Sequence, residues 1–325
     1  GTINAFIYHH FGKQDQYPST SVSDKQFKEH LKYLEKNDYS VMTLGNALDL
    51  LYSEDRLPEK TAVITIDDGY RSIRENAVPL LDKYGYRATI FVPTSHVGGG
   101  NYLTWGQIAE LQKKGFEIGN HSHSHEYFLN HPKGKIAEKF EEDLKKSHKL
   151  FEQHLGGVPD LYAYPFGEYN PEMTEVLKKH GYRAAAAQKS GVICTESNQF
   201  ALPRFPMNLN YGKPEDFAEK LRMNPLRVVK AEPSDPVVVS GQNPPKLELT
   251  VKNSEIYSEG LQCFVGGKRN CSIEHTRKKD RLVIRVSSTD KLASRRTLYT
   301  VTASSEDGSR WFWYSHLWII PEYGE

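Results

Sequence analysis

The first two thirds of the chain alternate short apolar runs with amphipathic segments, and this alternation limits the fold more than any other feature. Roughly seven such pairs occupy about 220 residues. Strands that alternate with helices predict a parallel sheet covered by helices, and this number predicts a distorted (β/α)7-type barrel of the α/β class. The expected strands are Ala5–His9, Tyr39–Met42, Ala62–Asp67, Ala88–Val92, Phe116–Asn120, Leu161–Tyr164 and Ala184–Ala187.

The amphipathic segments carry ordinary helix signals. Ser23 with Gln26, and Thr104 with Gln107, form capping-box patterns that predict a helix start at each place. Gly115 marks the end of the second of these helices. The expected helices are Phe27–Asn37, Leu44–Tyr52, Ala77–Tyr84, Ile108–Lys114, Ile136–Leu155 and Glu172–His180.

The pattern changes after about Leu226. Prolines at positions 233, 236, 244 and 245 interrupt a stretch that no longer looks helical, and β-like runs separated by turns follow it. About 95 residues of this kind predict a small all-β sandwich of immunoglobulin-like size. We therefore expect a barrel domain at residues 1–226 and a C-terminal sandwich domain at residues 227–325. The expected strands of the sandwich are Lys246–Val251, Gln262–Val265, Leu282–Val286, Thr297–Ala303 and Trp311–Ile320.

The last of these segments, Trp311–Ile320, has aromatic residues on both faces if it is a strand. One face can fill the core of the sandwich, but the other must be covered or must bind something. We favour docking of that face against the barrel. The alternative is a platform of aromatic rings that binds sugars.

The charge of the chain gives no reason to expect a polyanionic partner. The 325 residues include 42 Lys and Arg against 41 Asp and Glu, a formal net charge of +1, and the two signs are interleaved. This balance argues against nucleic acid and against anionic membranes as partners. No apolar run approaches the roughly 20 residues that span a bilayer, so we expect no transmembrane segment. The oligomeric state stays open.

Two features bear on the compartment. No basic and apolar leader is present at Gly1, so a signal peptide either never existed or has been removed. Cys263 and Cys271 flank a glycine-containing stretch that looks like a hairpin, where a cross-strand disulfide would imply an oxidising compartment. Two free thiols on the hairpin are the alternative. Cys194 stands alone.

Polar or unusual residues stand at the ends of four expected strands. His9 ends the first, Asp67 and Asp68 end the third, His121 ends the fifth, and the run Tyr164–Gly167 ends the sixth. In parallel α/β barrels the carboxyl ends of the strands carry the functional groups, so we expect these side chains to share one face. Two adjacent carboxylates and a His-x-x-x-His spacing can hold a metal ion and leave one acid free as a base.

Two short motifs in this region resemble those of a known family. The segment Thr65–Gly69 resembles the Thr-Phe-Asp-Asp-Gly motif of the polysaccharide deacetylases, carbohydrate esterase family four, and His121–His125 matches their His-Ser/Thr-x-x-His motif. The resemblance covers roughly residues 1–225. It implies a distorted barrel and a metal-dependent hydrolysis that removes acetyl groups from N-acetylated sugars.

The resemblance also implies a role for each residue of these motifs. Asp68, His121 and His125 would hold a divalent metal, most often zinc, with cobalt, nickel or manganese in some members. Such a ligand set leaves positions open for a water and a substrate oxygen, and the metal lowers the pKa of that water. Asp67 would be the general base. The middle histidine, His123, would be exposed or would support the ligands.

A third family motif supplies a donor for the oxyanion, and here it reads Ala163–Phe166. By resemblance, the backbone N–H of Phe166 would stabilise the tetrahedral oxyanion. Tyr164 of the same motif would line the substrate pocket. Trp105, at the start of a helix near the site, would either wall this pocket or pack in the core.

The chain departs from the common family pattern in two ways. Ala163 stands where the family has the arginine that orients the catalytic aspartate, and the usual downstream Leu-x-His motif is absent. The Tyr-His pair at positions 8 and 9 resembles the start of a subgroup with circularly permuted motifs. In that subgroup this histidine is the general acid, so we assign the role to His9 in preference to His10. Arg204 would pair with Asp67 and hold it ionised, or else form a surface salt bridge.

Together these residues predict a metal-dependent N-deacetylase that acts outside the cytoplasm, in the periplasm or as a secreted protein. Its substrate would be a polysaccharide that contains N-acetylglucosamine, such as peptidoglycan, poly-N-acetylglucosamine or a chitin-like polymer. Two alternatives stay open. The same site suits an O-acetyl esterase, and the departures from the family pattern suit a glycan-binding protein with weak activity.

Overall fold

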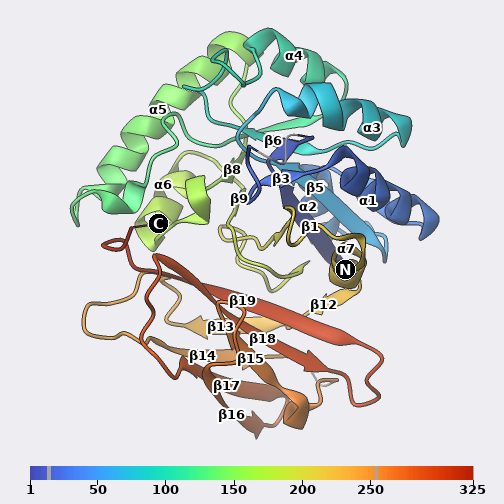
Figure 1. The fold of residues 1–325 in the computed structure, drawn as a ribbon. Coiled ribbons are helices and arrows are strands. Elements are labelled where there is room, and N and C mark those ends of the chain that lie inside the picture. Colours follow the sequence, from blue (N-terminus) through green and yellow to red (C-terminus); the bar gives the residue numbers. More distant parts are fainter. Residues whose placement is uncertain (13–15, 253–254, 325) are drawn as a thin grey trace.

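The computed structural model describes residues 1–12, 16–252 and 255–324, which form a curled α/β sheet with its helices and a pair of β-sheets beside it (Figure 1). The fold class predicted from the sequence is therefore confirmed. The curled sheet contains β1 (Thr2–Tyr8), β4 (Ser40–Met42), β5 (Thr61–Ile66), β6 (Thr89–Val92), β7 (Glu117–Asn120), β8 (Leu161–Ala163), β9 (Ala184–Ala186), β10 (Ile193–Cys194) and β11 (Phe205–Pro206).

The seven expected strands of this sheet are all present, and their order explains why their ends meet. The strands lie in the order β10-β1-β5-β6-β7-β8-β9, and every pair from β1 to β9 is parallel. Leu202 forms a bridge with Ala186 at one edge, and Phe205 pairs with Phe6 of β1. The segment 202–206, whose strand the sequence did not predict, thus connects β9 with β1, the two ends of the parallel series.

Helices cover the outside of the curled sheet (Figure 1). Both predicted capping boxes form, with Ser23 and Thr104 as the N-caps. The helix that begins at Pro214 was not predicted. The helices are α1 (Asp24–Lys36), α2 (Leu44–Tyr52), α3 (Val78–Lys83), α4 (Trp105–Lys113), α5 (Ile136–Leu155), α6 (Pro171–Lys179) and α7 (Pro214–Leu221). Short elements are β2 (His10–Phe11), β3 (Ser21–Val22), a π-helix at Ile73–Ala77 and 3-10 turns at Phe128–Asn130, Pro165–Gly167 and Ser258–Gly260.

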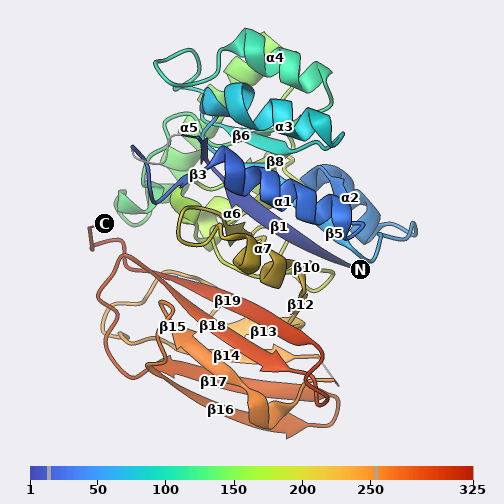
Figure 2. The ribbon, with the colours of Figure 1, turned by 45° about the vertical axis from the view of Figure 1, so that its right-hand side comes forward.

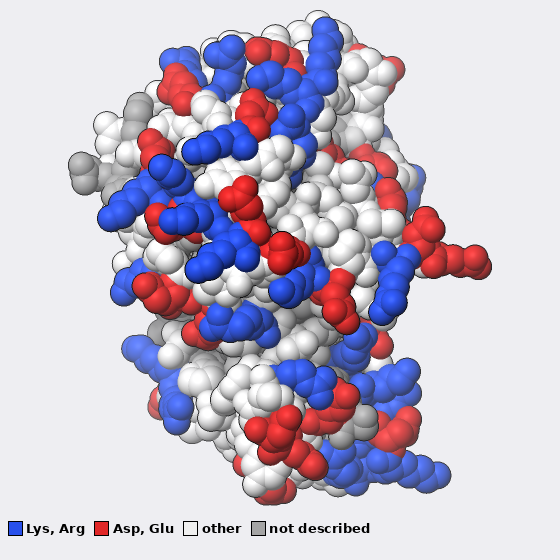
Figure 3. Space-filling view, turned by 90° about the vertical axis from the view of Figure 1, so that its right-hand side faces the viewer, with Lys and Arg blue, Asp and Glu red and all other residues white. Residues whose placement is uncertain are grey.

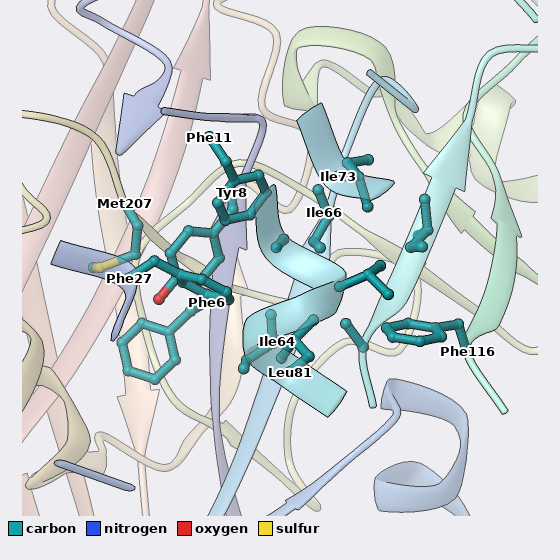
Figure 4. Packing of buried hydrophobic residues seen from close by; sticks show 14 of the residues in the cluster. Phe6, Tyr8, Phe11, Phe27, Ile64, Ile66, Ile73, Leu81, Phe116 and Met207 are labelled. Carbon is teal, nitrogen blue, oxygen red and sulfur yellow. The ribbon is translucent and has the colours of Figure 1, made fainter. Parts of the chain in front are cut away.

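The largest core cluster lies between the curled sheet and its helices (Figure 4). Phe6 of β1 packs on Phe217 of α7, with ring centroids 4.5 Å apart, and Tyr8 meets Phe27 of α1 edge-on at 5.2 Å. Burial of such rings is the main favourable contribution to folding. It fixes β1 and β5, whose ends carry the polar motifs, against the helices.

The C-terminal unit is built from two four-stranded sheets, β12-β19-β18-β15 and β13-β14-β17-β16. Their apolar faces share one core cluster, as a sandwich requires. The boundary between residues 226 and 227 stays a prediction; β12 precedes it and already belongs to the sandwich. The strands are β12 (Met223–Pro225), β13 (Val228–Glu232), β14 (Lys246–Val251), β15 (Gln262–Val265), β16 (Cys271–Lys278), β17 (Arg281–Ser288), β18 (Arg296–Ser304) and β19 (Trp311–Ile319).

Cys263 and Cys271 form a disulfide, and the expected hairpin with its glycine turn forms between them but does not extend as far as the cysteines. A tight turn does occur between Val265 and Lys268. However, β15 pairs with β18 while β16 pairs with β17, so the two cysteines lie in different sheets. The disulfide therefore joins the two layers of the sandwich across their core.

Docking of the aromatic strand against the barrel is confirmed (Figure 2). On β19, Phe312 and Trp318 belong to the core of the sandwich, whereas Trp313 packs edge-on against Phe205 of β11 with ring centroids 5.8 Å apart. Leu317 belongs to a cluster formed mainly by barrel residues. The alternating side chains of one strand thus serve two cores, which explains the aromatic residues on both of its faces.

The surface is evenly mixed in charge. On the face shown in Figure 3, acidic and basic side chains alternate over both units, which agrees with the nearly neutral composition. In the described ranges, none of the helices has the length and hydrophobicity that a bilayer crossing requires.

Candidate active site

The polar motifs meet at the carboxyl ends of the parallel strands. His9 directly follows β1, Asp67 and Asp68 directly follow β5, and His121 directly follows β7. β1 and β5 are neighbours, and β6 alone separates β5 from β7. The topology therefore brings together side chains that are more than fifty positions apart in the sequence.

Asp68, His121 and His125 form a cluster of metal-ligand type. One donor atom from each lies within 4.8 Å of the other two. The Asp68 Oδ1 atom is 3.2 Å from His121 Nε2 and 3.1 Å from His125 Nε2. His123 lies outside this cluster. Its Nδ1 atom is 2.9 Å from the Thr94 hydroxyl, so its side chain lies beside the ligands and is not one of them.

The hydrogen bonds of the cluster fit a cation between its atoms. His121 Nδ1 donates to the Ala163 carbonyl over 2.7 Å, so in the neutral ring Nε2 carries a lone pair. That lone pair faces the Asp68 carboxylate, and two such acceptors repel each other unless a proton or a metal ion lies between them. Two imidazoles and one carboxylate, with His121 oriented by a second partner, are a donor set that suits zinc and similar divalent metals.

The backbone around these ligands is held in an unfavourable conformation. Asp68, Ser122 and His125 have φ angles of 72°, 73° and 53°, in the left-handed region that non-glycine residues avoid. The His125 N–H donates to the Ser122 hydroxyl over 2.8 Å. Such conformations persist only where the surroundings determine them, and they are common at functional sites.

Asp143 of α5 fixes the histidine loop, and the sequence analysis missed it. One carboxylate oxygen accepts the His123 N–H at 2.8 Å and the other accepts the Ser124 N–H at 2.9 Å. A signal was available in the helix pattern. Asp143 lies between Phe140 and Leu144 on the buried face of α5, and an acid at such a position needs partners.

Asp67 and Arg204 form a bidentate ion pair in the interior. Arg204 Nη1 and Nη2 donate to the two carboxylate oxygens over 2.7 and 2.9 Å, and Nη1 also donates to the Thr65 hydroxyl. The Arg204 side chain is fully buried, which excludes the surface salt bridge. Burial would raise the pKa of Asp67, but the Arg204 guanidinium and the His121 ring hold that pKa below its ordinary value.

His9 faces the same groups from the end of β1. Burial lowers the pKa of its imidazole, while the negative charges of Asp68 and Asp67 act in the opposite direction. The net shift is downward, so a proton on His9 is more easily given up than one on an exposed histidine. Tyr8 pairs with Ile66, and its carbonyl accepts the Asp67 N–H over 2.9 Å, so His9 and Asp67 stand at the ends of neighbouring strands.

His10, the alternative to His9, belongs instead to a row of stacked rings that the sequence analysis did not predict. Its ring lies between those of Tyr17 and Tyr70, at centroid distances of 4.1 and 3.6 Å. The row continues from Tyr70 to Tyr102 at 5.0 Å and from Tyr102 to His96 at 4.9 Å. At one end of the row, the His96 ring lies 5.9 Å from that of the ligand candidate His125, and at the other end Tyr17 is exposed to solvent.

Phe166 lies beside the metal-ligand cluster. It has a left-handed φ of 58° in the turn Pro165–Gly167. Its ring meets His125 edge-on at 4.7 Å and stacks on Tyr127 at 3.8 Å. The turn that carries the Phe166 amide is thus next to the cluster, and the role of that amide stays a prediction.

Tyr164 and Trp105 do not line a pocket beside the cluster, contrary to the expectation from the sequence. Tyr164 is fully buried, and its hydroxyl donates to the Phe200 carbonyl over 3.0 Å. Trp105 stacks on His154 at 4.6 Å and meets Phe151 edge-on at 5.6 Å, so α4 packs on α5 through this ring. Both aromatic side chains are used for packing, as the alternative for Trp105 proposed.

A second buried ion pair links this region to the sandwich. Arg295 Nε and Nη2 donate to the two oxygens of Glu168 over 2.7 and 2.8 Å, and Arg296 Nη1 donates to the same carboxylate over 2.9 Å. The Arg295 guanidinium also lies 4.4 Å from the centre of the Tyr127 ring. No local sequence signal identified these partners, because 127 positions separate Glu168 from Arg295.

Comparison with known proteins places these features in a family. The model of the family described as polysaccharide deacetylase matches residues 54–185. A poly-beta-1,6-N-acetyl-D-glucosamine N-deacetylase of Staphylococcus aureus is 30% identical over 214 residues, which are 62% of this chain and 72% of that protein. YxkH of Bacillus subtilis is 33% identical over 187 residues, which are 57% of this chain and 65% of that protein.

Solved structures share the fold of the barrel. The deacetylase PplD of Streptococcus pyogenes has a TM-score of 0.62 at 20% identity and covers 68% of this chain and 98% of its own. IcaB of Ammonifex degensii has a TM-score of 0.58 at 24% identity and covers 68% of this chain and 97% of its own. Both matches extend over about the length of the α/β unit.

Proposed function

The chain belongs to the polysaccharide deacetylase family, and from this premise we propose that it removes N-acetyl groups from a polysaccharide of N-acetylglucosamine, outside the cytoplasm, in a metal-dependent hydrolysis. The observation that carries the proposal is the position of an ionised, unligated Asp67 beside the cluster of Asp68, His121 and His125. Among the candidate polymers we favour poly-N-acetylglucosamine, because the relative from Staphylococcus aureus is named for that substrate.

In this proposal Asp68, His121 and His125 hold a divalent metal, with zinc as the first choice and cobalt, nickel or manganese as alternatives. The bound metal would activate a water and polarise the acetyl carbonyl. The buried hydrogen bond from His121 to Ala163 orients one ligand, and Asp143 fixes the loop that leads to His125.

Asp67 is proposed as the general base that takes the proton of the attacking water. Both of its oxygens accept hydrogen bonds from Arg204, which keeps the carboxylate charged although it is almost fully buried. Its Oδ2 atom lies 3.9 Å from His121 Nε2, so it is near the cluster without belonging to it. In this way Arg204 would orient the catalytic aspartate, the role of the family arginine whose position is occupied here by Ala163.

His9 is proposed as the acid that protonates the leaving amine. His9 follows β1, which pairs with the strand that precedes Asp67 and Asp68. Burial lowers the pKa of its imidazole, so the protonated ring gives up its proton more readily. The backbone N–H of Phe166 is proposed as the donor to the tetrahedral oxyanion, because the turn that carries it is next to His125.

The test is acetate release from poly-N-acetylglucosamine, peptidoglycan and chitin oligomers by metal-stripped and metal-reloaded protein. We expect release only after reloading, a loss of about 10²–10⁴-fold in Asp67→Asn with metal binding retained, and a large loss in His9→Ala. His275→Ala, in the sandwich, is the matched control and should keep full activity.

Full activity of metal-stripped protein, or of Asp67→Asn, would contradict the proposal. If reloaded protein releases no acetate from any of these polymers but still binds one of them, the glycan-binding alternative replaces it. Release from O-acetylated sugars alone would establish the esterase instead.

A further inference from the structure

A cavity of about 190 Å³ lies between the barrel and the sandwich, apart from the metal-ligand cluster. Its wall includes Lys189 and Ser190 from the segment after β9 and Trp313 and His316 from β19. None of the residues assigned to catalysis or to the metal belongs to this wall. Cavities at the junction of two units are frequent ligand sites.

Lys189 brings a positive charge into this cavity. Only 8% of the residue is exposed, and burial lowers the pKa of its amine to about 8. It forms no ion pair among the described residues, and the ring of Tyr314, 5.7 Å away, is the contact of its ammonium group. The carboxylate in the same wall, Glu196, is paired with Arg227 at 2.8 Å. A buried cation without a counter-ion is costly, so an anion that enters the cavity would be stabilised by Lys189.

His316 adds an unused hydrogen-bonding atom. It is 4% exposed, and its Nε2 atom has no partner within the described part of the chain. Burial, together with the charge of Lys189, lowers the pKa of His316 to about 3, so its ring is neutral at physiological pH. A neutral imidazole can donate one hydrogen bond without adding charge. The other lysine of the wall, Lys230, is paired with Glu232 at 2.7 Å, so Lys189 is the unpaired cation of this cavity among the described residues, and His316 adds a neutral donor beside it.

We propose that this cavity binds a small monovalent carboxylate, with Lys189 as its counter-ion and His316 as a hydrogen-bond donor. A single positive charge matches a single negative charge. Val192, Leu226 and Trp313 in the wall are apolar and suit a short aliphatic tail. Acetate is the simplest compound of this class and fits the volume. The site does not depend on the function proposed above.

The cavity shares a segment of backbone with the candidate active site. The Lys189 carbonyl accepts the backbone N–H of Arg204 over 2.8 Å, and the Ala187 carbonyl accepts the Arg204 Nε over 3.1 Å. Arg204 in turn holds both oxygens of Asp67. An anion bound to Lys189 thus lies next to the residues that position the pair, which gives the small carboxylate a route to influence activity.

Calorimetric titration of the full chain with sodium acetate, against sodium chloride at equal ionic strength, tests the site. Acetate can also bind at the metal-ligand cluster, so Asp68→Asn is titrated beside the wild type. We expect saturable binding in the wild type and in Asp68→Asn, and at least tenfold weaker binding in Lys189→Met. Lys178→Met, which removes an exposed lysine, should bind acetate like the wild type.

Absence of saturable binding in the wild type would overturn the proposal, as would equal binding of chloride, undiminished binding in Lys189→Met, or loss of binding in Asp68→Asn. If Lys189→Met does not fold, His316→Phe provides the second variant. It keeps the cation but removes the donor, and we expect severalfold weaker acetate binding; unchanged binding would exclude the proposed role of His316 and, with it, the site.

Discussion

Two buried arginine–carboxylate pairs with nearly the same geometry serve different purposes in this molecule. Asp67 and Arg204 meet inside the barrel at 2.7 and 2.9 Å, and Glu168 and Arg295 meet between barrel and sandwich at 2.7 and 2.8 Å. All four side chains are at most 5% exposed. Distance and burial therefore do not distinguish the pair at the candidate site from the pair at the interface.

The difference lies in what else faces each pair. Glu168 also accepts a hydrogen bond from Arg296, and Arg295 also donates to the Pro321 carbonyl over 2.7 Å, so the interface pair is surrounded by structural partners. Asp67 instead faces His121 and the metal-ligand cluster. A carboxylate that has an arginine on one side and a candidate metal site on the other can stay ionised and still accept a proton.

The interface pair nevertheless reaches the site through packed rings. The Arg295 guanidinium lies 4.4 Å from the Tyr127 ring, Tyr127 stacks on Phe166, and Phe166 meets His125. The sandwich thereby supports the turn that is expected to stabilise the oxyanion. These contacts connect the second unit with the candidate site, which its sequence alone did not suggest.

The largest effect is expected for Arg204→Met. Removing one partner of a buried pair should lower stability by about 3–5 kcal/mol. The unpaired Asp67 would be protonated up to a higher pH, because burial then raises its pKa without opposition from the guanidinium. We expect kcat/KM at neutral pH to fall by roughly 100-fold, with the acidic limb of its pH profile moved upward. An acidic limb that stays in place would contradict the role of Arg204; Arg204→Lys, which keeps the charge, is the control.

A similar loss of stability, about 3–5 kcal/mol, is expected for Arg295→Met, because it leaves Glu168 buried without its main partner. The effect on kcat/KM should be smaller than for Arg204→Met, since Arg295 acts through Tyr127 and Phe166 and does not contact Asp67. Urea denaturation and acetate release on the same samples measure both. In the double variant Arg295→Met, Glu168→Met, most of the stability should return; if it does not, the uncompensated charge is not the cause of the loss.

The sequence was informative where the determining contacts are local. The capping box of Ser23 and Gln26 and the alternation of apolar runs depend on neighbouring residues, so α1 and the parallel strands could be predicted. Asp67, Asp68 and His121 could be placed on one face because strand order in such folds brings their ends together. The geometry of a bidentate pair between Arg204 and Asp67 needed the structure.

What could not be predicted depends on contacts between distant segments. The hairpin expected between Cys263 and Cys271 forms only at its glycine turn, because beyond the turn β15 and β16 each pair with a strand that comes later in the sequence. Tyr164 ends a strand as a pocket residue would, but its side chain turns into the core. Glu168 was not singled out from the sequence, because its partner Arg295 is 127 positions away in the other unit. Such pairings leave no periodic trace in the sequence.

The third prediction concerns the stability of the barrel at low pH, which should depend on His30. His30 of α1 is fully buried, accepts from the Tyr8 hydroxyl and donates to the Gly212 carbonyl, and burial lowers its pKa to about 4. Because the unfolded chain binds the proton more readily, this contribution is fully present above about pH 6.5 and is lost as pH falls toward 4, by up to about 3 kcal/mol. Urea titrations at pH 7 and pH 4.5 should show a smaller loss in His30→Gln, which cannot titrate. An equal loss in both proteins would assign the acid sensitivity to other groups, such as the buried His316 of the sandwich.

The smallest effect is expected for the disulfide, and it tests whether the support of the site comes from the ion pair or from the sandwich as a whole. Closing a loop as short as that between Cys263 and Cys271 stabilises by about 2 kcal/mol. Replacement of both cysteines by serine should therefore lower the free energy of unfolding by this amount, which a lower melting temperature reports. It should leave kcat/KM unchanged, because the disulfide joins the two sheets of the sandwich and does not touch the barrel. Cys194→Ser, at a buried thiol of β10, is the control for loss of a cysteine elsewhere.

If the double serine variant loses activity as Arg295→Met does, the sandwich acts through its overall rigidity. If only Arg295→Met loses activity, the support passes through Glu168, Tyr127 and Phe166.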